Sequence, residues 1–294
     1  MSMDFSRIRR VPVFAAVVLF TLKLLDGTGF SWGFYAHKLI NRKAVEGLPN
    51  SIRPFFEAHQ DFLSEHAIDP DLWRKNDPAE APRHYIDIDM YGPYPFEALP
   101  RAYEKAVAKF GRKTVHDRGI GPWWVVQRLD ALAGHMRAGR TDSILIVAAA
   151  LGHYIADLHV PLHTTENYDG QLTSNKGIHS RFERYLVERY KDDIEVKVQP
   201  AKLVRKPLDA IFEVVLQSYR FNDDILQADT QSKRPGKKYD DRNDYDDAYY
   251  AELHRRVGHV AEARLSAAAS AVASFWYTAW VRAGQPKLTP AKSP

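Results

Sequence analysis

The chain has 294 residues, enough for one large domain or two small ones, and its composition excludes several classes of protein. It contains no cysteine, so neither disulfides nor thiolate metal sites stabilise it. The formal net charge is only +4, which is too small to indicate nucleic-acid binding by bulk electrostatics. Packing, or a metal bound through nitrogen and oxygen, must therefore stabilise the fold.

The first 31 residues have the pattern of a secretory signal. Three arginines precede an apolar run over 11–22, and small side chains precede a cleavage point after Ser31. A retained membrane helix is the alternative, but the run is short for a span and Lys23 interrupts it. We expect residues 1–31 to be removed, so that the mature chain begins at Trp32 and is periplasmic or extracellular.

The rest of the chain shows mainly helical patterns. Apolar residues recur at helical spacing over 36–48, and 141–159 is apolar all round, as expected for a helix buried in a bundle. Pro161 ends that segment because proline lacks an amide proton and disfavours helix just before itself. Residues 179–190 and 265–283 are also predicted to be helical.

Strand signals are sparse in the sequence. The only good alternating run is IEVKVQ at 194–199, which we do not predict to be a strand, and the charged segment 229–247 predicts a mobile surface loop. No internal repeat or change of composition divides the chain. The sequence predicts an all-α fold, a multi-helix bundle in a single domain over 32–284, followed by a C-terminal tail over 285–294.

Histidines and acids recur at helical spacing in two segments. His153 and Asp157 are four residues apart in a very apolar helix, so they project from one face, and His163 follows the proline break. His179 and Glu183 repeat the spacing. Each pair alone is usually a solvated helix face, but a carboxylate in so apolar a helix needs a cation. Imidazole and carboxylate are the ligands that zinc uses when thiolate is absent.

These motifs resemble those of one superfamily, the bacterial zinc-dependent phospholipases C and the single-strand-specific zinc nucleases of fungi and plants. The pattern His153-x3-Asp157-x5-His163 matches the family's central signature. RHYID resembles its His-aromatic-x-Asp segment and supplies His84. GIHSRFE is close to the phospholipase form, with Glu183 where the nucleases carry Asp. The resemblance implies a mostly helical fold and a cluster of three zinc ions.

The resemblance also implies nine ligand residues, some of them shared. The first zinc ion would take Asp69, His84, His153 and Asp157. The second would take the α-amine and carbonyl of Trp32 with His37, and would share Asp157 as a bridge. The third would take His163, His179 and Glu183. Asp71 is the alternative to Asp69 in the segment HAIDPD. Only cleavage before Trp32 creates the required amine, because an amide nitrogen has no available lone pair.

The activity implied by the resemblance is hydrolysis of phosphate esters by a metal-bound hydroxide. Asp69, as a proton acceptor, and Asp157, as the bridging ligand, are the implied catalytic acids. Arg74 and Arg83 flank the ligand segments and are candidate phosphate contacts, although arginine is more often a surface residue. The expected partner is the substrate alone, because no stable protein partner is evident, and we expect a monomer.

The substrate is either a phospholipid or a single-stranded nucleic acid or nucleotide. The phospholipase form of GIHSRFE and the short interval between His163 and His179 favour a phospholipase C-type phosphodiesterase. The five-residue step from Trp32 to His37 favours the alternative, a single-strand-specific nuclease or 3'-nucleotidase. A non-catalytic, zinc-stabilised binding protein is the third reading. An open site with three protein ligands favours an enzyme over this reading, because structural zinc sites are closed by four.

Overall fold

A computed structural model describes residues 33–289, so the expected signal segment, Trp32 and the last five residues lie outside the described chain. The described residues form helices and contain no strand, which confirms the all-α prediction. The proposed domain boundaries at 32, 284 and 294 remain predictions.

The elements follow one another as a series of long helices separated by short ones. The α-helices are α1 (Phe34–Ala44), α2 (Arg53–Glu57), α3 (Gln60–Glu65), α4 (Asp69–Trp73), α5 (Tyr103–Phe110), α6 (Arg112–Asp117), α7 (Gly121–Arg137), α8 (Thr141–His159), α9 (Ile178–Ser180), α10 (Val187–Arg189), α11 (Pro207–Tyr219), α12 (Asn222–Ser232) and α13 (Asp247–Arg282). The 3-10 turns are η1 (Val45–Gly47), η2 (His66–Ile68), η3 (Ala81–Arg83), η4 (Ile88–Tyr91), η5 (Pro161–Thr164) and η7 (Arg242–Asp244), and η6 (Arg181–Leu186) is a π-helical turn.

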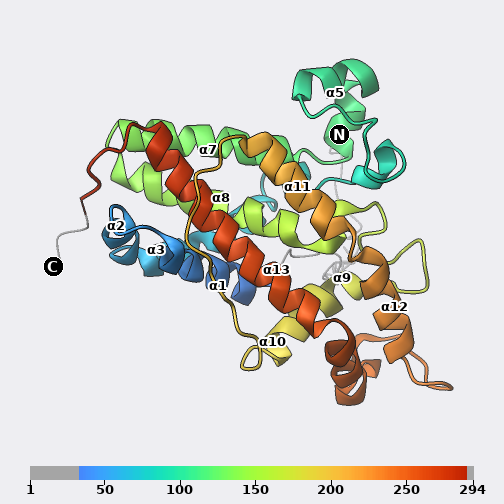
Figure 1. Cartoon of the computed structure of the whole chain (residues 1–294). Helices are drawn as coiled ribbons and strands as arrows, with labels where there is room; N and C mark the ends of the chain where they lie inside the picture. Colours follow the sequence, from blue (N-terminus) through green and yellow to red (C-terminus); the bar gives the residue numbers. More distant parts are fainter. Residues whose placement is uncertain (1–32, 290–294) are drawn as a thin grey trace, which may run out of the picture.

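Helix α8 lies at the centre of the bundle and begins and ends where the sequence predicts. Every residue over 148–159 is buried, and α1, α7, α11 and α13 pack against the helix (Figure 1). Its length and apolarity would suit a membrane span, but 72% of the apolar window is buried inside the protein, as in a core helix. The all-round apolar pattern therefore reflects burial on every side.

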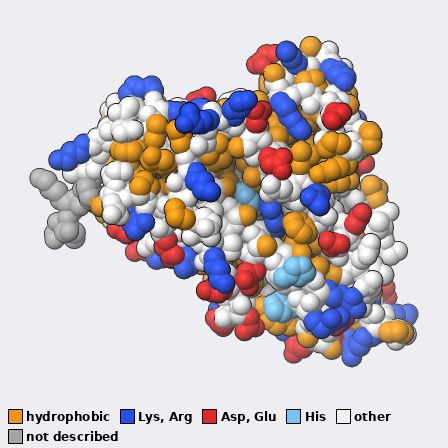
Figure 2. Space-filling view, in the orientation of Figure 1, with side chains coloured by type: hydrophobic (Ala, Val, Ile, Leu, Met, Phe, Trp, Pro, Cys, Tyr) orange, Lys and Arg blue, Asp and Glu red, His pale blue; other side chains and the backbone are white. Residues whose placement is uncertain are grey.

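The other predicted helices also form, 36–48 as α1 with η1 and 179–190 as α9, η6 and α10. The segment 265–283 belongs to α13, which begins earlier, at Asp247, where the Asp246 side chain accepts a hydrogen bond from the amide of Tyr249. The first residues of the charged segment 229–247 belong to α12, which continues to Ser232, and Asp246 pairs with basic side chains of the loop that follows. Basic and acidic side chains are interspersed over the face seen in Figure 2, in keeping with the small net charge.

The alternating run 194–199 is extended but pairs with a helix instead of another strand. The chain from 197 to 204 runs along α13 (Figure 1), and its amides donate to hydroxyls spaced four residues apart on that helix. The donor and acceptor pairs are Lys197 with Ser266, Gln199 with Ser270, Lys202 with Ser274, and Val204 with Thr278, at 2.9–3.2 Å. These bonds satisfy the backbone donors that a neighbouring strand would otherwise satisfy.

A buried asparagine connects α1 to α8 close to His37 and His153. Asn41 is fully buried, and its Nδ2 donates to the carbonyls of Leu63 on α3 and Ala149 on α8, at 3.0 and 3.1 Å. Gly152 of α8 leaves the space that this side chain needs, since a Cβ there would lie 2.0 Å from Asn41 Oδ1.

We predict that Gly152→Ala lowers the free energy of unfolding by about 1–3 kcal/mol, because the added methyl must displace a side chain held by two buried hydrogen bonds. Gly134→Ala is the matched control, because a Cβ at this α7 position meets nothing within 4 Å. It should be neutral or add up to about 1 kcal/mol. Denaturant unfolding measures both changes, and equal stabilities for the two variants would contradict the predicted packing.

Candidate metal centre

Buried histidines and acids from six parts of the chain meet beside the C-terminal half of α8. They form three groups, and within each group the ligand atoms lie within 4.8 Å of one another. The groups are His37, His153 and Asp157; Asp71, His84 and His153; and His163, His179 and Glu183. Each side chain is predicted from the sequence, as a ligand or, for Asp71, as the alternative to one. Trp32 lies outside the described residues, so its role remains a prediction.

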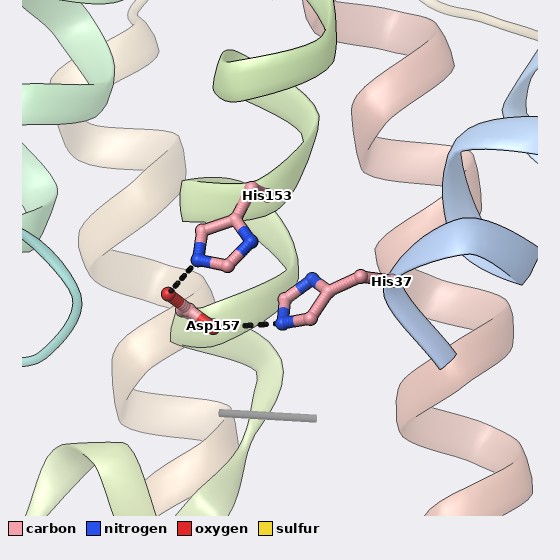
Figure 3. A group of neighbouring side chains, drawn as sticks. All are labelled: His37, His153 and Asp157. Atoms are coloured by element: carbon pink, nitrogen blue, oxygen red, sulfur yellow. Dashed lines mark ion pairs between the residues drawn. The ribbon is translucent and has the colours of Figure 1, made fainter. Parts of the chain in front are cut away.

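Asp157 lies between the first two groups, with a different set of histidines at each oxygen. Oδ1 is 3.4 Å from His37 Nε2, which projects from α1, whereas Oδ2 is 3.1 Å from His153 Nε2 (Figure 3). Oδ2 also lies 2.8 Å from His84 Nδ1. A carboxylate that presents one oxygen to each group has the geometry of a bridging ligand.

Asp71, which the sequence offers as the alternative to Asp69, is the acid that lies with His84 and His153, and the ligand role of either acid remains a prediction. Asp69 begins α4, and its partly exposed carboxylate accepts a hydrogen bond from His66 Nδ1 at 2.8 Å. Asp71 lies two residues later and therefore on nearly the opposite face of the short helix. Its side chain is buried, with Oδ1 3.9 Å from His84 Nδ1 and 3.8 Å from His153 Nε2.

The third group forms where α9 and the η6 turn meet η5. His179 Nε2 lies 2.9 Å from Glu183 Oε2 and 3.1 Å from His163 Nε2, and His163 Nε2 lies 3.6 Å from Glu183 Oε2. The four-residue step from His179 to Glu183 places both side chains on one side of the helical segment, as predicted.

The carboxylates of the centre face mainly imidazole rings, and Arg74 Nη1 lies 3.7 Å from Asp71 Oδ1. Within residues 33–289, every ion pair of Asp157 and of Glu183 is made with a histidine. Burial opposes the charged form of His153, but Asp157 and Asp71 outweigh it and raise the pKa to about 9. Burial raises the pKa of Glu183 to about 8 and lowers that of His179 to about 4, so burial disfavours the charged form of both side chains.

The unsatisfied atoms of the centre fit a metal ion. Both oxygens of Asp71 and of Glu183, and Oδ1 of Asp157, are buried without a hydrogen bond. Leaving such atoms unsatisfied is costly, and a divalent cation would satisfy them. The ion-paired ligand atoms lie 2.8–3.9 Å apart, and all ligand atoms of a group lie within 4.8 Å of one another. These distances span the separation of about 3.4 Å expected for two ligands at about 2.0–2.2 Å from a tetrahedral zinc ion. The donors present therefore suit zinc.

Neighbouring carbonyl groups orient the histidine rings. His153 Nδ1 lies 2.8 Å from the carbonyl of Ala67, and His163 Nδ1 lies 3.0 Å from the carbonyl of His84. Each Nδ1 therefore carries the proton, which leaves Nε2 as the atom available to a metal.

Glu80 orients the ring of His84 and was not among the predicted site residues. Its buried carboxylate lies 3.4 Å from His84 Nε2 and accepts hydrogen bonds from Tyr154 and Arg83. His84 thus presents Nδ1 to Asp71 and Asp157. The four-residue spacing of Glu80 and His84 was visible in the sequence, but it is not part of the motif that identified His84.

A cavity of about 260 Å³ opens onto the centre. Its lining residues are Arg74, Ala81, His84, Tyr85, Asp87, Leu162, His163, Tyr168 and His179. Arg74, one of the two candidate phosphate contacts, therefore reaches the cavity. Arg83 does not line it, because its guanidinium pairs with Glu80 and stacks on the ring of Trp124 at 4.1 Å.

His159 lies between two predicted ligands in sequence but faces elsewhere. Its Nδ1 lies 2.8 Å from the carbonyl of Ile155, and burial, together with the nearby Arg264, lowers its pKa to about 3. This histidine is a neutral core residue, and none of its hydrogen bonds reaches a residue of the three groups.

No family model matches the chain, and no curated protein matches it by sequence. Among solved structures, it is similar to the alpha toxin from Clostridium absonum, with a TM-score of 0.52 and 13% identity. The similar region covers 86% of this chain and 65% of the toxin, so the chain spans less than two thirds of the toxin's length. The match shows that the chain shares the fold of this toxin, in keeping with the helical fold that the motifs predict. At this identity, the likeness is one of fold.

We predict that Asp71→Asn lowers the zinc content of the protein by one ion, because the amide replaces a charged ligand. Asp69→Asn is the matched control, since the same change is made two residues away at a carboxylate that contacts His66 instead. It should keep the full zinc content. Elemental analysis after dialysis compares the two, and loss of zinc from the Asp69 variant alone would return the ligand role to Asp69.

Proposed function

We propose that the chain is an exported zinc-dependent hydrolase of phosphate esters. The observation that carries this proposal is the third group, in which three side chains converge within residues 33–289 and two of them, His163 and His179, line the cavity. A structural zinc site is normally closed by four protein ligands, whereas a catalytic site keeps one position for water or substrate. A three-ligand group at the wall of a cavity therefore supports an enzyme over a zinc-stabilised binding protein.

Zinc bound to these groups would supply Lewis acidity and lower the pKa of a water molecule at the site. The protein's own residues would bind and orient the substrate. Arg74 lines the cavity and its Nη1 lies 3.7 Å from Asp71 Oδ1, so the guanidinium is held beside the ligand groups, where it can donate to phosphate oxygens.

Asp71 takes over the proton-acceptor role that the resemblance gave to Asp69. Both of its oxygens are buried in the centre without a hydrogen bond, and a nearby carboxylate can accept the proton of an attacking water. The carboxylate of Asp69 instead accepts a hydrogen bond from His66 Nδ1. Asp157 keeps its proposed role as the bridging ligand.

The same cavity supports a phospholipase C-type activity on a cationic headgroup. Tyr85 and Tyr168 provide aromatic walls, and Asp87 provides a carboxylate beside them. Aromatic faces and a carboxylate stabilise a quaternary or primary ammonium group. Burial and the neighbouring Asp89 and Glu166 raise the pKa of Asp87 to about 7, so this side chain changes charge near neutral pH.

The nuclease or 3'-nucleotidase activity remains the alternative, because an aromatic ring and an acid also suit a nucleobase. Purified mature protein should be assayed on a phospholipid panel, single-stranded DNA and RNA, and nucleoside monophosphates. Release of phosphorylated headgroups from phospholipid supports the phospholipase reading, and cleavage of nucleic acid alone supports the nuclease reading. No hydrolysis by zinc-loaded protein on any of these would contradict the proposed function.

Export and processing belong to the same proposal, because the second zinc ion would need the free amine of Trp32. Adding one residue before Trp32 should leave the protein folded but lose one zinc ion and most of the turnover. The new amine is displaced by about 3.5 Å, whereas a zinc–nitrogen bond of about 2.0–2.1 Å tolerates little error. Mass spectrometry and zinc analysis check this, with Trp32→Phe on a correctly processed chain as the control. Full zinc content and turnover in the extended form would show that the amine is no ligand.

We predict that the KM for a cationic-headgroup substrate falls as the pH rises through about 7. The raised pKa of Asp87 means that its carboxyl group is ionised only above about pH 7, and only the ionised form attracts the cationic headgroup. Asp87→Asn should remove this dependence and raise the KM at pH 8 by roughly tenfold, about 1.4 kcal/mol. Asp117→Asn is the control, since this exposed carboxylate pairs with Lys113 outside the cavity. A KM that keeps its pH dependence in the Asp87 variant would exclude this residue as the headgroup contact.

A further inference from the structure

A buried ion pair lies behind the third ligand group. Arg181 Nε and Nη2 donate to Asp229 Oδ1 at 3.0 and 2.8 Å, and the two side chains are 6% and 0% exposed. Arg181 follows His179 by two residues and precedes Glu183 by two. Because residues two apart lie on nearly opposite faces of a helix, Arg181 points away from the side on which the two ligands meet. The pair therefore holds the ligand-bearing segment from behind.

Asp229 is the hub of this arrangement. Its Oδ1 also accepts a hydrogen bond from the hydroxyl of Tyr249 on α13, and its Oδ2 accepts from Asn175 Nδ2 at 2.7 Å. We refer to Arg181, Asp229, Tyr249 and Asn175 as the Asp229 clamp. Because Asp229 belongs to α12, the clamp joins the ligand segment to the two helices beside it (Figure 1).

The clamp also fixes the loop that separates His163 from His179. Arg181 Nη2 and Nη1 donate to the carbonyls of Asn175 and Lys176, at 3.0 and 2.9 Å. The loop then turns into α9 at Gly177, where φ is 86° and a Cβ would lie 2.6 Å from Arg181 Nη1. Only glycine suits this position, and the loop closes directly over the guanidinium.

The ligands of the other two groups are held by different parts of the molecule. They project from α1, α4, α8 and the segment after η3, and their rings are oriented by Glu80 and the carbonyl of Ala67. No hydrogen bond or ion pair within residues 33–289 joins a clamp side chain to a ligand of those two groups. The clamp is therefore specific to the third group.

We propose that the Asp229 clamp positions His179 and Glu183 and so determines the zinc affinity of the third site alone. This inference rests on the proposed function, because it requires that the third group binds zinc. Arg181 and Asp229 are positioning residues, since they act through the segment that carries the ligands. Residues that support ligands in this way commonly change metal affinity by about 10–100-fold.

The test uses Asp229→Asn, which keeps the shape of the side chain but removes the charge and replaces one acceptor oxygen by a donor. After dialysis at limiting free zinc, the wild-type protein should retain three ions and the variant two. Competition with a chromophoric chelator should show one dissociation constant raised at least tenfold and the other two unchanged. Circular dichroism shows whether the variant is folded.

A second variant separates positioning from the cost of an unpaired buried charge. Arg181→Met combined with Asp229→Leu removes both charges of the buried pair together, a change that is often neutral for stability. Lys233, which also pairs with Asp229 at 2.8 Å, is 21% exposed and can be solvated in this variant. This double variant should be folded and should still lose the third ion. Trp276→Phe is the control for general destabilisation, because it removes a buried hydrogen bond between α13 and α8, to the carbonyl of Ala148. It should keep three ions.

Retention of all three ions with unchanged affinities by the Asp229 variant would overturn the inference, as would equal loss of all three ions. A wild-type protein that binds no third ion would overturn both this inference and the three-zinc proposal. The wild-type measurement thus distinguishes a failure of the proposed function from a failure of the clamp alone.

Discussion

The constraint on which the rest of the structure depends is the burial of two carboxylates, Asp157 and Glu183. Within residues 33–289, both form ion pairs with histidines alone. Isolated burial of a carboxylate costs far more than the net stability of a domain, so such groups persist only with a compensating cation. For Asp157, the neighbouring imidazole of His153, whose pKa is raised to about 9, provides part of the compensation. Zinc would replace the proton of this ring and satisfy the remaining lone pairs of both carboxylates, so metal binding and folding should be coupled.

This requirement explains why the most apolar helix of the protein carries its most polar site. Helix α8 is buried on all sides over 148–159, so the ligands that complete its His153 and Asp157 must come from surrounding elements. Those elements are held in register by polar contacts of their own. Asn41 joins α1 to α8, Glu80 orients His84, and Arg181 with Asp229 secures the segment of the third group. A layer of buried hydrogen bonds thus surrounds the ligands and fixes their geometry.

Much of this could be predicted from the sequence because it is local. The bounds of α8 follow from its apolar run and Pro161, and the four-residue steps of the histidine–acid pairs follow from helical geometry. The choice between Asp69 and Asp71 could not be made in the same way. Both acids occur in one short helix, and the side facing the centre depends on how α4 packs, which no local pattern records.

The missed features all depend on contacts between distant segments. Asp229 is 48 residues from Arg181 and lies in a charged stretch that predicts a loop, so nothing local marks it as a partner. The run 194–199 alternates like a strand, but its amides donate to hydroxyls about 70 residues away on a helix. Tyr168 reaches the cavity only because the loop before His179 is folded back. Such pairings depend on the tertiary structure, which local sequence patterns do not determine.

The central claim is that the buried histidine and carboxylate groups are one centre for three zinc ions. Crystals of the processed, zinc-loaded protein, measured on both sides of the zinc absorption edge, test this most directly. The account predicts three anomalous peaks, each within about 2.3 Å of its ligands. Two peaks should share Asp157, and the third should lie among His163, His179 and Glu183. Absence of anomalous density at these side chains in zinc-loaded crystals would contradict the account.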